Sequence, residues 1–106
     1  MTETDKFQGI ILVDLTTLIK HLDKYEEKHW SDYFRKIHRL IDNGDLRAIE
    51  SLNKMRGGMG SFFDLVICKI NGHIIEKEDE DFANSELMRL GDLVLKSADK
   101  LKRLIK

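Results

Sequence analysis

Apolar residues recur every three or four positions in two long stretches, one towards each end of the chain, and proline is absent throughout. This spacing places the apolar side chains along one face of an α-helix. Proline would interrupt such a helix, because it lacks an amide donor and its ring clashes with the preceding turn. The pattern therefore predicts two long amphipathic helices, at residues 4–27 and 79–104, that pack through their apolar faces.

Shorter helices are predicted between these two stretches. An apolar stripe that starts at Trp30 ends at Asn43-Gly44, a pair suited to a left-handed helix C-cap. Asp45 can then cap a third helix. The apolar residues of that helix are Leu46, Ile49, Leu52 and Met55. Because short connections join antiparallel neighbours, these helices are expected to pack side by side.

The pattern leaves the secondary structure of residues 62–75 open. Nearly every residue from Phe62 to Ile70 is apolar, which suits a buried helix and a buried strand equally. Asn71-Gly72 can form a hairpin turn, or a helix C-cap followed by extended chain. A helix is favoured because an isolated two-stranded hairpin is only marginally stable in water. The predicted fold is an all-α bundle of four or five helices, with a short β-hairpin around residues 65–76 as the alternative.

Length and composition limit the chain further. A sequence of 106 residues has apolar surface for one core, so residues 1–106 are expected to form a single helical domain. Neither a membrane-spanning run nor a signal peptide is recognisable, and membrane association is not expected. Cys68 is the single cysteine, which indicates a reducing cytoplasm. The net charge of -1, with acids interleaved among the bases of the last helix, predicts no binding of nucleic acid.

The most distinctive segment is a glycine-rich turn between the third predicted helix and the apolar run. Its glycines permit a tight turn, and Ser61 with Asp64 three residues later resembles a capping box. A purely structural turn, with Met59 plugging the core, is the favoured interpretation. The alternative is an anion-binding turn at the start of a helix, where backbone amides and a nearby cation would hold the ligand. The candidate ligand-binding residues are Arg56, Gly57, Gly58, Gly60, Ser61 and Asp64.

No pattern of catalytic or metal-binding residues is recognisable. Ser61, Asp64 and His73 have the residue types of a nucleophilic triad, but Asp64 is better explained as the capping partner of Ser61. The Gly-x-Ser-x-Gly elbow is missing. The histidines lack the three- or four-residue spacing that places two ligands on one helix face. No catalytic residue, metal site or cofactor is expected, and a non-enzymatic role is favoured.

The run Gly57-Gly58-Met59-Gly60-Ser61-Phe62, followed by Asp64-Leu65-Val66, resembles the signature of an uncharacterised family of small bacterial proteins. In that family a Gly-Gly-Met-Gly-Ser-Phe-Asn-Asp turn lies in mid-chain. Phe63 stands here where the family pattern has asparagine. Supporting matches are Trp30, Gly44-Asp45, Asn71-Gly72-His73, Asn84 and Leu87. The resemblance implies a fold class and a bacterial cytoplasmic setting, and it supplies no activity.

Without a catalytic pattern, the chain is expected to work by binding another protein or a second copy of itself. An immunity protein or an antitoxin would be an example. This suggestion is an analogy, based on the small size of the chain and on its lack of a catalytic pattern. Trp30 and Tyr33 are the candidate partner-binding residues, because aromatic side chains dominate interface energetics; core packing is the other interpretation of Trp30. The alternative function is a small-ligand or anion-binding protein, or a minor enzyme, that uses the turn at residues 57–61.

Overall fold

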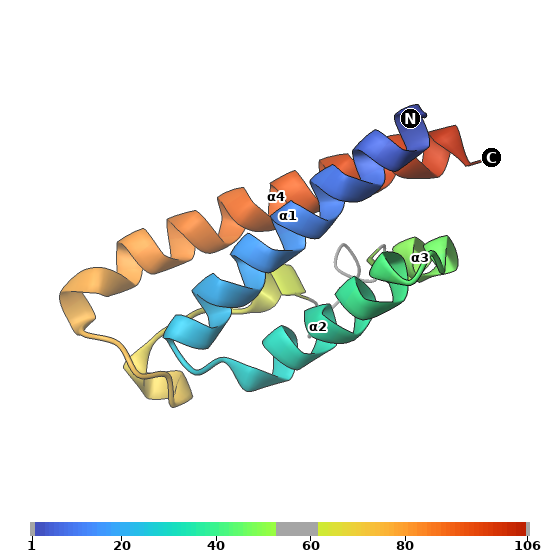
Figure 1. The fold of residues 1–106 in the computed structure, drawn as a ribbon. Coiled ribbons are helices and arrows are strands. Elements are labelled where there is room, and N and C mark those ends of the chain that lie inside the picture. Colours follow the sequence, from blue (N-terminus) through green and yellow to red (C-terminus); the bar gives the residue numbers. More distant parts are fainter. Residues whose placement is uncertain (1, 53–61, 106) are drawn as a thin grey trace.

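The computed structural model describes residues 2–52 and 62–105. Within these ranges the chain forms α-helices and short 3-10 helices and no strand, which confirms the predicted all-α bundle. The α-helices are α1 (Glu3–Lys24), α2 (Lys28–Asp42), α3 (Ile49–Leu52) and α4 (Glu80–Leu104). In Figure 1, α1 runs antiparallel to both α2 and α4 and packs against each of them.

A Schellman motif ends α1. The Glu26 amide donates to the Asp23 carbonyl at 3.0 Å, and the Glu27 amide donates to the Leu22 carbonyl at 2.9 Å. Glu26 has a φ of 57°, the left-handed conformation that glycine usually adopts at this position. Because of this motif α1 ends at Lys24, three residues before the end that the apolar pattern predicted.

The same motif ends α2, as the sequence predicted. The Gly44 amide donates to the Ile41 carbonyl at 3.0 Å, and the Asp45 amide donates to the Leu40 carbonyl at 2.8 Å. Gly44 has a φ of 87° and takes the left-handed position that follows the C-cap Asn43.

The predicted third helix is present as two short turns. The first is the 3-10 helix η1 (Leu46–Ala48), and α3 follows it directly. Asp45 is the N-cap, as predicted, and its side chain accepts a hydrogen bond from the Arg47 amide. Ile49 and Leu52 are buried, whereas Met55 lies outside the described residues.

The core is formed where α1 packs against α2 and α4. Its fully buried large side chains are Phe34, Phe62, Ile11, Leu15, Leu18, Leu22, Ile41, Ile49, Leu52, Ile67 and Leu87. The apolar spacing of the sequence also predicts that Ile10 and Ile105 lie on the apolar helix faces, but both are exposed. Ile10 lies at the margin of its helix face, and Ile105 follows the last helical residue of α4.

The chain from residue 62 to residue 79, here called the connection, is neither the buried helix nor the hairpin that its composition predicted. It contains three short 3-10 helices with irregular segments between them. These are η3 (Phe62–Asp64), η4 (Lys69–Asn71) and η5 (Lys77–Asp79). Gly72 has a φ of 87° and caps η4, so Asn71-Gly72 serves as a helix C-cap and not as a hairpin turn. The connection runs back to the end of the bundle where α1 joins α2 (Figure 1).

Gly91, in the middle of α4, lies directly against the connection. A Cβ atom at this position would be 2.8 Å from Cε2 of Phe62 and 3.4 Å from Cε1 of Phe63. Phe62 is fully buried and meets the rings of Trp30 and Phe34 edge-on, at centroid distances of 5.4 and 5.3 Å. The missing side chain therefore lets an aromatic ring pack on the helix backbone.

Candidate functional site

Most of the predicted ligand-binding residues lie outside the described residues. These are Arg56, Gly57, Gly58, Gly60 and Ser61. Asp64 is described, and it is an exposed residue of η3. An anion-binding role for the glycine-rich turn, and the capping box between Ser61 and Asp64, stay predictions.

Trp30 and Tyr33, the predicted partner-binding residues, are partly buried and pack against the core. Their rings meet edge-on at a centroid distance of 5.3 Å. The Tyr33 hydroxyl donates to the Ser51 carbonyl at 2.5 Å, which ties α2 to α3. Burial raises the pKa of the Tyr33 phenol above its ordinary value of 10.0. Both side chains stabilise the fold, and their role in partner binding stays a prediction.

His73 is buried in a polar cluster that fastens the connection to the corner between α1 and α2. Nδ1 of His73 lies 3.1 Å from the Cys68 amide nitrogen and 3.2 Å from the Cys68 carbonyl oxygen. Nε2 is 3.2 Å from Oε1 of Glu27 and donates to it. The other oxygen of Glu27 accepts a hydrogen bond from the Trp30 amide at 2.9 Å and thereby caps α2. Both ring nitrogens of His73 are thus used within the fold.

Asn84 of α4 holds the middle of the connection. The Ile67 amide donates to Oδ1 of Asn84 at 2.8 Å, and Nδ2 of Asn84 donates to the Ile67 carbonyl at 2.9 Å. Nδ2 also donates to the Glu80 carbonyl one helical turn earlier. This side chain satisfies both backbone groups of a fully buried residue, as a neighbouring strand would in a sheet. No local pattern in the sequence predicts this pairing.

These contacts fix a connection that presents apolar side chains to solvent. Ile70 is 97% exposed and Ile74 is 64% exposed. Phe82, in the first turn of α4, is 63% exposed. The Ile74 amide donates to the Tyr25 carbonyl at 3.3 Å, which places Ile74 beside the end of α1.

Ile74 and Phe82 line one groove of about 470 Å³, which we call the Ile74–Phe82 groove. Its lining residues are Lys24, Tyr25, Ile74, Ile75, Glu76, Asp79 and Phe82. Three segments meet there: the end of α1, the connection and the start of α4. Sequence reasoning missed this groove, because an exposed isoleucine or phenylalanine has the same residue type as a buried one.

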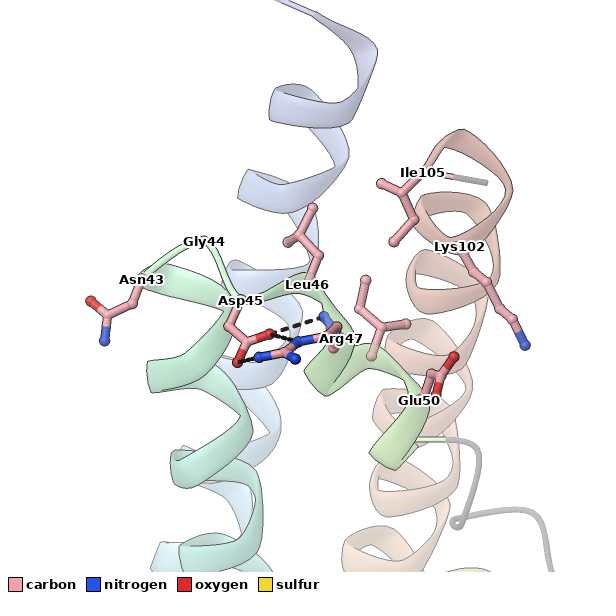
Figure 2. A pocket seen from close by; sticks show the side chains of 9 residues that line it. Asn43, Gly44, Asp45, Leu46, Arg47, Glu50, Lys102 and Ile105 are labelled. Carbon is pink, nitrogen blue, oxygen red and sulfur yellow. Dashed lines mark hydrogen bonds and ion pairs between the residues drawn. The ribbon is translucent and has the colours of Figure 1, made fainter.

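A second groove, of about 690 Å³, lies between α3 and the end of α4 (Figure 2). Leu46 and Ile105 face the space between these elements, whereas Asn43 and Lys102 point away from it. Nε of Arg47 lies 3.1 Å from Oδ1 of Asp45. This pairing lowers the pKa of Asp45 and raises that of Arg47. Arg47 is thus paired with Asp45, and because Asn43 and Lys102 point away, few polar side chains of the lining converge on the groove.

Neither a metal-binding cluster nor a membrane-spanning helix occurs among residues 2–52 and 62–105. In the described ranges no three side chains among histidine, cysteine, aspartate and glutamate gather closely enough to hold a metal ion. Among the helices of residues 2–52 and 62–105, none has both the length and the hydropathy needed to cross a membrane.

Comparison with known proteins identifies a family and no activity. Neither the curated proteins nor the solved structures contain a match. A family model described as "Domain of unknown function (DUF6966)" matches residues 23–76. The matched span starts at the end of α1 and ends in the part of the connection that bonds back to that corner, through Ile74 to Tyr25 and through His73 to Glu27. Because the match covers half of the chain, this protein belongs to the family of the domain of unknown function DUF6966.

Proposed function

We propose that this protein works by binding another protein at the Ile74–Phe82 groove. The observation that carries the proposal is the exposure of two large apolar side chains, 64% for Ile74 and 63% for Phe82, that line one groove. Single exposed apolar residues are ordinary on protein surfaces. Apolar side chains gathered at a concave site are typical of surfaces that bind a partner.

The way the connection is held supports the proposal. Asn84 fixes Ile67, and the contact between His73 and Glu27 fixes the segment just before Ile74. The backbone that presents Ile74 is therefore ordered before any partner arrives. Preorganisation of this kind lowers the conformational entropy that association must overcome.

The chemistry of the described side chains favours binding over catalysis. Both ring nitrogens of His73 are occupied within the fold, and Arg47 is paired with Asp45. An immunity protein or an antitoxin in a bacterial cytoplasm would work by such binding alone. The lone free Cys68 is in keeping with a reducing cytoplasm.

Native mass spectrometry of the protein, purified gently from the cells that make it, tests the proposal. The wild type is expected to retain an additional mass of protein size. The double substitution Ile74→Ser and Phe82→Ser removes the apolar surface of the groove and should release that mass. Both side chains are largely exposed, so the fold should survive, and circular dichroism checks this.

The matched control is Val13→Ser on α1, which removes an apolar side chain that is 65% exposed, well away from the groove. This variant should retain the partner as the wild type does. A wild type that carries no second protein, or a double variant that holds its partner unchanged, would contradict the proposal.

A further inference from the structure

The Ile74–Phe82 groove is bordered by an acidic stretch of chain. Residues 76–81 contain five carboxylates and one lysine. Glu76 and Asp79 line the groove itself, and Glu78 and Asp81 flank them in the chain.

Three lysines lie at or near the groove: Lys24 in its lining, Lys77 in the acidic stretch, and Lys69 beside Glu76. Nζ of Lys24 lies 5.4 Å from the centroid of the Tyr25 ring, in cation–π geometry. Nζ of Lys69 is 3.5 Å from Oε2 of Glu76, and its amide donates to Glu80. These three lysines are outnumbered by the five carboxylates of residues 76–81, of which Glu76 is paired with Lys69. The net charge of the residues around the groove is therefore negative.

The acidic residues beside the groove restrict which partners its apolar side chains can bind. An acidic border repels the phosphates of nucleic acids and of anionic lipids. It attracts a segment whose apolar side chains are flanked by lysine or arginine, because opposite charges steer encounter and fix orientation. The groove is open to solvent and has room for a few side chains of such a segment, as in the binding of an amphipathic helix to a groove.

We infer that the partner docks through a basic amphipathic segment, with its apolar residues on Ile74 and Phe82 and its cations facing Glu76, Asp79 and their acidic neighbours. The inference rests on the proposed function and adds the chemical class of the partner. The rest of the partner lies outside the groove and is not specified by it.

Three labelled synthetic helices test the inference by fluorescence anisotropy with the full chain. The first has a leucine face flanked by lysines, the second replaces the lysines by glutamates, and the third replaces the leucines by serines. The first peptide should bind at least tenfold more tightly than either of the others. Its affinity should fall when ionic strength rises from about 0.01 to about 0.15 M, because the screening length then shrinks from roughly 30 to 8 Å.

Protein variants separate the two parts of the interaction. Ile74→Ser with Phe82→Ser should weaken binding of the first peptide at least tenfold, as expected for central apolar anchors. Glu76→Gln with Asp79→Asn should weaken it roughly threefold and reduce its salt dependence. The controls are Val13→Ser and Asp92→Asn, the latter about 20 Å along α4 from Asp79, and neither should change the affinity.

The outcomes distinguish this inference from the proposed function. Equal binding of the lysine and glutamate peptides would overturn the basic partner and leave an apolar docking site. Equal binding of the leucine and serine peptides, or no effect of the serine variants at residues 74 and 82, would overturn the groove as the site and both proposals with it. Self-association that the same serine variants abolish would replace the basic segment by a second copy of this chain.

Discussion

Gly91→Ala is the substitution whose effect on stability the structure predicts most sharply. In an isolated helix this change stabilises by about 1 kcal/mol, because glycine loses more backbone entropy than alanine on folding. Here the new Cβ would lie 2.8 Å from Cε2 of Phe62, closer than real Cβ contacts come. Phe62 is fully buried between Trp30 and Phe34, so the ring cannot move away without displacing its neighbours.

The magnitude follows from two opposing terms. Inserting a methyl group into a packed core costs about 1–3 kcal/mol, and the gain in helix propensity offsets about 1 kcal/mol of it. We therefore expect Gly91→Ala to lower the free energy of unfolding by about 1 kcal/mol, with a range of about 0–2 kcal/mol. For a domain of this size, 1 kcal/mol shifts the melting temperature by roughly 4–8 °C.

The chain offers a matched control for this substitution. Gly9 also lies in a long helix, α1, and nothing stands within 4 Å of a Cβ built on it. Gly9→Ala should therefore raise the free energy of unfolding by up to about 1 kcal/mol. The difference between the two identical substitutions isolates the contact with Phe62, at about 1–3 kcal/mol.

Urea unfolding measures both variants, with Trp30 fluorescence and circular dichroism as probes. Trp30 contacts Phe62, so its emission should also report any displacement of that ring in the native state. If Gly91→Ala stabilises the protein as much as Gly9→Ala does, the close approach of Phe62 to α4 is not real and the reasoning fails.

Three further substitutions probe other contacts. Asn84→Ala should cost about 2–4 kcal/mol, because it leaves the buried amide and carbonyl of Ile67 unpaired, and hydrogen exchange at the Ile67 amide should accelerate. Glu26→Gly should raise the free energy of unfolding by up to about 1 kcal/mol, since glycine adopts a φ of 57° without strain. The urea midpoint should rise accordingly, and an unchanged midpoint would contradict this. Tyr33→Phe should abolish an alkaline loss of stability. Burial raises the pKa of the Tyr33 phenol in the folded state, so the contribution of Tyr33 to stability is complete below pH 10 and declines as pH rises through the raised pKa. The free energy of unfolding of both proteins, measured against pH, tests this.

The long helices, the end of α2 and the start of η1 could be predicted because their determinants are local. The apolar stripes of α1, α2 and α4 follow the helical period, and the caps at Gly44 and Asp45 depend on residues within one turn. The group that packs on Gly91, the Phe62 ring, lies 29 positions away and could not be named from the spacing. Glu26 has no sequence signal for its left-handed conformation.

Only the tertiary structure decided the form of the connection and the groove beside it. The backbone of Ile67 is paired by Asn84, 17 residues away, and His73 is held by Glu27, 46 residues away. Contacts at such separations leave no local periodicity, so the apolar run of the connection was predicted as a buried helix or a hairpin. The exposure of Ile74 and Phe82 follows from the same cause. The sequence by itself determined which residues are apolar and which segments form helices, whereas long-range hydrogen bonds and packing decided which apolar residues face solvent.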